Sequence, residues 1–268
     1  MDFTNRPNTP IMQNTAKNCT PATLDPCNQV NPKFVPISSI AAAAAGISTA
    51  KTQEPAFLKA LVLASDQDFV VNDITIGNQS LNCSDSSIAG SLFKPLSGRQ
   101  PLIGVAVDGN IQMSVDMTLD AAGDVEGLFS CEAIDTAPSI QAQQLQLNKF
   151  FGMGKVNIAA GATAQLSAQC LRGGVFLKSL VVQVHGGAPL GNATDGLDIV
   201  ITDITIKGRS IFTGQAGAVV GSIGLETFVK AGLVGINTLI DTNERVVISL
   251  TNKAGAGAVN VSAGFYCQ

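Results

Sequence analysis

Short runs in which apolar and polar residues alternate make up most of the chain, and Gly, Asn, Asp or Ser bounds each run. The longest run is Val105–Leu119, in which every second position is apolar apart from a break at Asp108-Gly109-Asn110. This alternation predicts strands with one buried face, and Asp-Gly supplies the positive φ of a tight hairpin turn. A similar pair of runs, Val247–Leu250 and Val259–Val261, flanks the glycine-rich stretch 252–257. Strands recurring roughly every 8–12 residues are typical of a β-sandwich or barrel.

The same short segments occur twice along the chain, in the same order. Phe57–Val62 matches Phe176–Val181, and Asp68–Ile76 matches Asp198–Ile206. One such match can arise by chance, but an ordered series indicates an internal duplication. The further matches, first copy then second, are Lys33-Phe34 with Lys149-Phe150, Ile40–Ala42 with Ile158–Ala160, Ser80 with Ser210, Ser87-Ile88 with Ser222-Ile223, Phe93 with Phe228, Leu102–Val105 with Leu233–Ile236, and Phe129–Cys131 with Phe265–Cys267.

The duplication predicts an all-β protein built from two tandem β-sandwiches, each with length for eight strands. Residues 33–134 form the first sandwich and residues 149–268 the second, with residues 135–148 as the connector. Residues 1–32 lie outside both copies and contain five Pro among many Asn and Thr, which predicts an extended N-terminal arm.

Helical periodicity is scarce in both copies. The run Ala41–Ala45 favours a helix by propensity. Its counterpart Ile158–Ser167 contains a Gly and the β-branched Thr163, so we expect a bent strand in both places. Short helices are expected near Ser86–Phe93 and Ser222–Lys230, where Ile and Phe fall near helical spacing.

Charge is low for a soluble protein of 268 residues. Asp, Glu, Lys and Arg make up 13% of the chain, against about 25% in a typical soluble protein. A chain with so little charge is expected to meet other protein over much of its surface. The net charge is −4 and no basic run occurs, which argues against sequence-specific nucleic-acid binding. One His, one Tyr and no Trp argue against His-ligated metal sites and against sugar-stacking platforms.

The N-terminus has no basic segment followed by an apolar one, so no signal peptide is expected, and synthesis in the cytoplasm is predicted. The six cysteines are then expected to be reduced. Cys131 and Cys267 end equivalent strands and are expected to be buried, whereas Cys19 and Cys27 in the arm could pair outside the cell. No CxxC spacing occurs, which argues against zinc.

Candidate catalytic chemistry is sparse, and no catalytic or cofactor-binding residue is assigned. A Ser-His-Asp set needs His185 as its base, but His185 opens a glycine-rich stretch without a counterpart in the first copy, so we expect a loop residue. Asp73 and Asp203 each occur in an Asp-Ile-Thr sequence. Paired carboxylates serve glycosidases across one cleft. These two occupy equivalent positions in separate sandwiches, so a turn or edge-strand role is favoured.

Two acidic clusters are candidate calcium ligands. Asp66 and Asp68 form one cluster, and Asp195 and Asp198 form the other. Carboxylate oxygens at loop tips suit Ca²⁺, although neither cluster has EF-hand spacing. The alternative interpretation is a set of solvated turn residues.

Tandem sandwiches, an arm rich in Pro and low charge resemble the double jelly-roll major capsid proteins of tailless, membrane-containing icosahedral viruses, including phages. The resemblance covers about residues 33–268 and has no defining short motif. It implies a homotrimer that imitates a hexamer and contacts neighbouring trimers in the virion shell. It also implies an arm that reaches a neighbouring trimer or an internal membrane, with vertex or minor capsid proteins as further partners.

Two other functions remain open at this point. One is a tandem β-sandwich surface or adhesin subunit, which predicts a signal peptide. The other is an enzyme or a non-catalytic ligand-binding sandwich, which predicts polar and aromatic residues gathered at one mouth of a sandwich.

Overall fold

The computed structural model describes most of the two predicted copies. It covers residues 32–94, 102–133, 149–185, 199–211, 223–224, 236, 238–253 and 257–267. The chain from Pro32 onward is one compact unit. The predicted arm (apart from Pro32) and the predicted connector lie outside the described residues.

Strands make up almost all of the described chain, and their bounds are as follows. The first copy contains β1 (Pro32–Pro36), β2 (Ile40–Lys51), β3 (Ala56–Ser65), β4 (Phe69–Ile76), β5 (Gln79–Ser80), β6 (Ile88–Ala89), the 3-10 helix η2 (Gly90–Phe93), β7 (Leu102–Val107) and β8 (Gln112–Ala133). The second copy contains β9 (Lys149–Ile158), β10 (Thr163–Gln169), β11 (Val175–His185), β12 (Ile199–Ile206), β13 (Arg209–Ser210), β14 (Ile223–Gly224), β15 (Thr238–Ile240), β16 (Arg245–Asn252) and β17 (Val259–Cys267).

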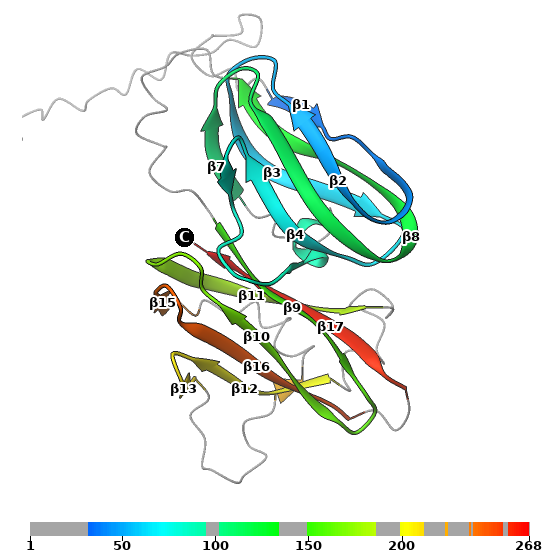
Figure 1. The fold of residues 1–268 in the computed structure, drawn as a ribbon, viewed down its shortest axis with the longest axis vertical. Helices are drawn as coiled ribbons and strands as arrows, with labels where there is room; N and C mark the ends of the chain where they lie inside the picture. Colours follow the sequence, from blue (N-terminus) through cyan, green and yellow to red (C-terminus); the bar gives the residue numbers. More distant parts are fainter. Residues whose placement is uncertain are drawn as a thin grey trace, which may run out of the picture. The chain divides into compact units, whose positions relative to one another are not determined.

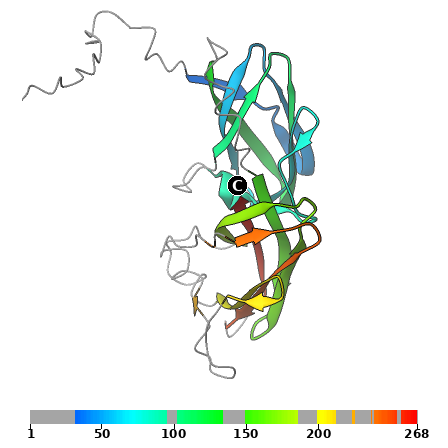
Figure 2. The ribbon, with the colours of Figure 1, turned by 90° about the vertical axis from the view of Figure 1, so that its left-hand side faces the viewer.

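The two copies have the same strand order. In the second copy one layer runs β15-β11-β17-β9, and the other runs β10-β16-β12-β13, with β14 also on β12. In the first copy β7, β3, the second half of β8 and β1 form the equivalent layer. β2, the first half of β8, β4 and β5 form the other layer, with β6 also on β4. Each copy is therefore an antiparallel jelly roll, and the predicted tandem sandwiches are confirmed (Figure 1; side view in Figure 2).

The strands were predicted correctly, but the hairpin at Asp108-Gly109-Asn110 was wrong. β7 pairs with β3, whereas the following β8 pairs with β2, β4, β3 and β1. The turn instead carries the chain from one layer to the other. Thr52 at the end of β2 secures it, since its backbone N–H donates to Ile111 O at 3.2 Å and its hydroxyl donates to Asp108 O at 2.9 Å. In the second copy the two runs that flank residues 252–257 do not form a hairpin either, because their strands, β16 and β17, lie in different layers.

The structure contains some of the expected helices and bends but not all of them within the described residues. In the first copy the expected helix is reduced to β6 and the single 3-10 turn η2. In the second copy the described part of that stretch is strand β14, and the remainder lies outside the described residues. The Ala-rich run is part of β2 and is bent, because its pairing with β8 shifts register at Ala43. Its counterpart is a corner between β9 and β10, where Gly161 adopts a φ of +69°.

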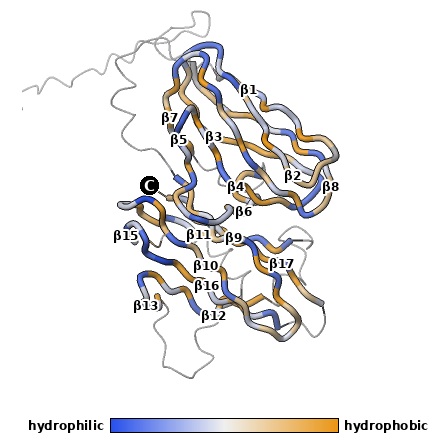
Figure 3. The backbone as a smooth tube through the Cα atoms, viewed as in Figure 1, coloured by the Kyte–Doolittle hydropathy of each residue, from blue (hydrophilic) through white to orange (hydrophobic). Residues whose placement is uncertain are grey.

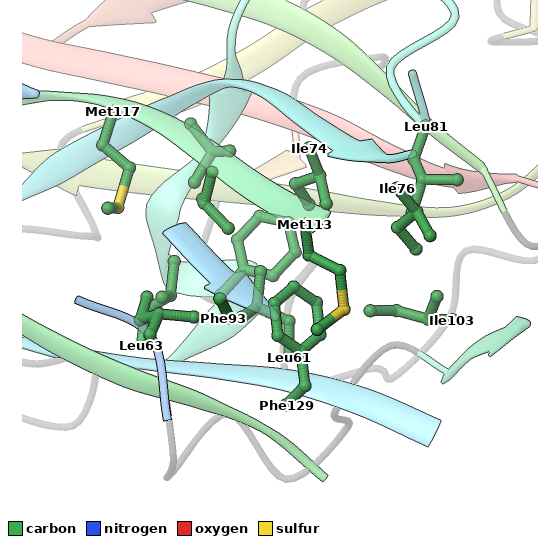
Figure 4. Close-up of a cluster of buried hydrophobic side chains, with 14 of the residues drawn as sticks. Leu61, Leu63, Ile74, Ile76, Leu81, Phe93, Ile103, Met113, Met117 and Phe129 are labelled. Carbon is green, nitrogen blue, oxygen red and sulfur yellow. The ribbon is translucent and has the colours of Figure 1, made fainter. Parts of the chain in front are cut away.

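Each sandwich encloses an apolar core between its layers, and the apolar positions follow the strands in Figure 3. Side chains from both layers of the first copy meet in its core, among them Leu61, Met113 and Phe129 (Figure 4). Each core also includes a residue from the other copy. Phe150 from β9 belongs to the first core, and Cys83 from the first copy belongs to the second core.

Because each core contains a residue of the other copy, we predict that the two sandwiches unfold together. Phe129 and Phe265 are both fully buried at equivalent positions. Truncation of either to Ala is expected to lower the free energy of unfolding by about 3–5 kcal/mol. Calorimetry on Phe129→Ala and Phe265→Ala should show one transition that moves down in both variants. Two separate transitions, with one of them unmoved in each variant, would contradict the shared unfolding.

Candidate functional site

The two Asp-Ile-Thr sequences form matched hairpin locks in the two copies. Asp73 and Asp203 each follow a register shift, where β4 pairs with β8 and β12 pairs with β16. The Asp73 carboxylate accepts hydrogen bonds from Ser80 Oγ at 2.6 Å and Thr75 Oγ1 at 3.3 Å. Asp203 accepts the equivalent bonds from the Ser and Thr hydroxyls of its own copy. Each Asp therefore closes the turn after its own strand, which is the turn role favoured from the sequence.

The most extensive polar and apolar contact between the copies is made by residues Leu81–Phe93, which we call the junction segment. Its backbone pairs with β9: Phe150 N–H donates to Leu81 O at 2.9 Å, and Cys83 N–H donates to Phe150 O at 2.8 Å. Further along, Gly154 N–H donates to Ser87 O at 2.8 Å. The junction segment of the first copy thus lies beside the edge strand β9 of the second copy and is joined to it by a parallel bridge between Asn82 and Phe150.

Apolar packing reinforces this backbone pairing. The Phe150 ring lies fully buried against Phe93 of η2, in an edge-to-face arrangement with ring centroids 5.2 Å apart. The ring of Tyr266 on β17 lies in a tilted arrangement to the same Phe150 ring, with centroids 6.2 Å apart. Phe150 belongs to the first core and Tyr266 packs against that core, so this part of the boundary between the copies is apolar.

Gly152 on β9 allows the junction segment to approach closely. A Cβ atom at this position would lie 2.2 Å from Ser86 O and 2.4 Å from the Ser87 carbonyl carbon. Asn82 shapes the segment that fills this space. Its amide donates to Ser86 O at 2.8 Å, while its side-chain oxygen accepts from the Ser84 hydroxyl at 3.0 Å.

His185 lies at the end of β11 rather than in a loop, so the loop prediction was wrong. Its side chain is fully buried. Nδ1 lies 2.9 Å from Asp120 Oδ2 on β8, and Nε2 lies 2.7 Å from Ser262 Oγ on β17. The carboxylate can only accept a hydrogen bond, so Nδ1 carries the proton and Nε2 accepts from the hydroxyl. Lys155 on β9 adds an ion pair to Asp120 at 2.5 Å.

This arrangement has the order of a Ser-His-Asp set but not its accessibility. Ser262 is 0% exposed, so its hydroxyl has no route to a substrate in this structure. Burial lowers the pKa of His185, and Lys155 lowers it further, while Asp120 opposes both effects by raising it. The imidazole is therefore held neutral. The group ties β8 of the first copy to β11 and β17 of the second.

A second polar group spans the same boundary and contains one of the calcium candidates. Asp68 Oδ1 accepts from Lys94 Nζ at 2.8 Å and from Gln183 Nε2 at 2.9 Å. Gln183 Oε1 in turn accepts from Ser91 N–H at 2.9 Å. The Asp68 carboxylate is therefore engaged with a cation of the protein itself.

Of the other calcium candidates, only Asp66 lies among the described residues. Asp66 Oδ1 accepts from Asp124 N–H at 2.9 Å, while Asp195 and Asp198 lie outside the described residues. Within the described ranges no group of three or more His, Cys, Asp or Glu side chains could hold a metal ion.

The cysteines of the described strands are buried free thiols. Cys131 and Cys267 are at most 1% exposed, as predicted, and Cys83 and Cys170 are buried beside β9 and β10. Burial raises the pKa of Cys131 to about 11, so it stays protonated at neutral pH. Cys19 and Cys27 lie outside the described residues.

No protein-family model matches the chain, and no curated protein matches it. Among solved structures the chain is similar to the crystal structure of the major capsid protein P2 from Bacteriophage PM2. The match covers 88% of this chain and 97% of that chain, at 10% sequence identity and a TM-score of 0.36. No helix among the described residues is long and apolar enough to cross a membrane.

The close approach at Gly152 gives a prediction for the junction. Gly152→Ala places a methyl group against the Ser86 and Ser87 backbone, which cannot yield as a side chain can. We expect a loss of about 1–3 kcal/mol in the free energy of unfolding, measured by denaturant titration. Gly46→Ala is the control, because its methyl group would meet only the flexible Ile40 side chain, at 3.0 Å. Equal effects in the two variants would contradict a tight junction at β9.

The buried imidazole gives a pH dependence. The native state holds the pKa of His185 below its ordinary value of 6.5, so the unfolded chain binds the proton more readily. Stability from the neutral imidazole is complete above about pH 6.5 and is lost as the pH falls toward the lowered pKa. Asp120, Lys155 and Asp68 are the charged groups that act on the imidazole.

The measurement is the free energy of unfolding at about pH 7.5 and about pH 5.5 for the wild type and His185→Gln, whose amide does not titrate. We expect the wild type to lose more stability on acidification than the variant. An identical loss in both proteins would show that His185 is not the group responsible.

Proposed function

We propose that the chain is a viral capsid protein whose trimers form pseudo-hexameric units of an icosahedral shell. Jelly rolls occur in capsid proteins, but also in lectins and cupins, so the fold alone does not choose among these functions. The observation that carries the proposal is the form of the contact between the two copies.

The two copies use different surfaces in that contact. The junction segment of the first copy pairs with β9 of the second copy, so two different surfaces of one fold meet. A contact between different surfaces of like units repeats from unit to unit, and it closes into a ring when the rotation allows. A chain with two such units already contains one step of the repeat. Three chains would supply six sandwiches, which is the outline of a hexamer.

Composition supports the same proposal. Only 13% of the residues are charged, which suits a protein whose surface is covered by copies of itself. In such a shell, residues 1–32 would extend to a neighbouring trimer or to an internal membrane. Vertex or minor capsid proteins would be further partners, and the virion would be the final location after synthesis in the host cytoplasm.

Native mass tests the proposal directly. Light scattering at several concentrations should give three times the chain mass of 27.5 kDa. Electron microscopy of concentrated samples should then show closed particles or curved fragments of a hexagonal lattice. A monomer at every concentration would contradict the trimer and would favour a tandem surface or ligand-binding sandwich instead.

A further inference from the structure

Two equivalent Phe residues differ sharply in exposure. Phe150 of β9 stands opposite Tyr266 of β17, and Phe34 of β1 stands opposite Ser130 of β8 at the same place in the first copy. Phe150 is fully buried, whereas Phe34 is 63% exposed. The difference follows from the junction segment, which covers β9 and has no counterpart on β1 among the described residues.

The surface that contacts Phe150 shows the same difference in exposure between the two copies. Leu81 N–H donates to Ile74 O at 2.8 Å, and Ile211 N–H donates to Ile204 O at 2.9 Å, which places Leu81 and Ile211 at equivalent positions. Leu81 begins the junction segment and is 1% exposed, whereas Ile211 is 41% exposed. One chain therefore buries Leu81 and Phe150 at its internal junction. It leaves their two equivalents, Ile211 and Phe34, open to solvent.

The backbone around Phe34 can accept the same pairing as β9. β1 and β9 each lie at one edge of their layer in the described chain. The outward N–H and C=O of Phe150 both bond the junction segment. Since Phe34 has the same pairing register, its N–H and C=O also face away from β8. An edge strand with an exposed aromatic residue is a surface for strand addition.

We propose that residues at Ile211 of one chain dock on β1 at Phe34 of a second chain, repeating the contact of Leu81 with Phe150 between molecules. The proposal rests on the proposed function, because it identifies the surface that would hold the trimer together. The occupant is a second copy of this chain, since the matching surface lies on the second sandwich of the chain itself.

Charged substitutions at these two positions test the surface. Phe34→Asp and Ile211→Asp each place a carboxylate in the apolar contact, so each is expected to convert trimers into monomers in light scattering. Ile47→Asp is the matched control, because Ile47 on β2 is also 63% exposed but has no part in this contact, and its mass should not change. Circular dichroism should remain near the wild type in all three variants, because all three side chains are exposed, and the melting temperatures of Phe34→Asp and Ile211→Asp should fall only by the stabilisation that assembly gives.

Chemical cross-linking gives a second readout that does not depend on loss of assembly. Phe34→Cys and Ile211→Cys are combined in one chain that also carries Cys19→Ser and Cys27→Ser. A short bis-maleimide should then yield covalent dimers and trimers on a denaturing gel, while either single cysteine variant in the same background should yield none.

The outcomes separate this inference from the proposed function. A wild-type trimer that survives both Asp substitutions, and a double cysteine variant that does not cross-link, would place the trimer contact on another surface while leaving the capsid proposal intact. A monomeric wild type would overturn both. Dissociation by Ile47→Asp as well would show a general effect of added charge and would overturn the assignment to Phe34 and Ile211.

Discussion

The pairing of the junction segment with β9 is the constraint on which the rest of the structure depends. It inserts backbone from the first copy beside an edge strand of the second, so hydrogen bonds as well as apolar area join the sandwiches. Buried edge groups must find partners, and here the partner is supplied by the other copy. The need to pair the backbone groups of β9 explains why Gly152 stands on β9 and why Phe150 packs in a core built mainly by the first copy.

The polar group of Asp120, His185 and Ser262 at the same boundary has a different effect. Burying the neutral imidazole beside the partly buried Asp120–Lys155 ion pair costs desolvation free energy that their hydrogen bonds only partly offset, so such a group is weak support for stability. Its geometry, however, is restrictive. The imidazole must meet an acid on β8 and a hydroxyl on β17 at once. A shift of one copy against the other would leave these groups unpaired, and we infer that the network selects one mutual arrangement of the copies.

The sequence predicted what is local and periodic. Period-two alternation located the strands, and matched segments such as Asp68–Ile76 and Asp198–Ile206 proved to be equivalent strands, β4 and β12. Pairing could not be predicted in the same way, because a turn such as Asp108-Gly109-Asn110 fits a hairpin and a crossing between layers equally well. One match was also displaced: Val105 was aligned with Ile236, whereas the strand registers make it equivalent to Thr238.

The junction itself lay beyond sequence reasoning. Asp120, His185 and Ser262 are far apart in the chain and carry no shared spacing, so only the fold brings them together. One signal was present and unused. Gly152 in the second copy matches Pro36 in the first, two residues with opposite backbone properties at one position of a repeat. Such a difference marks a place where duplicated units have taken on different surroundings.

The continuity of β8 gives the two halves of the chain different mechanical properties. In the first copy one unbroken strand belongs to both layers, so a force on either layer passes directly along a paired backbone. In the second copy the equivalent positions belong to two strands, since β16 ends at Asn252 and β17 begins at Val259. The described layers of the second sandwich therefore share no single strand, and we expect a load to shear the second sandwich more readily than the first.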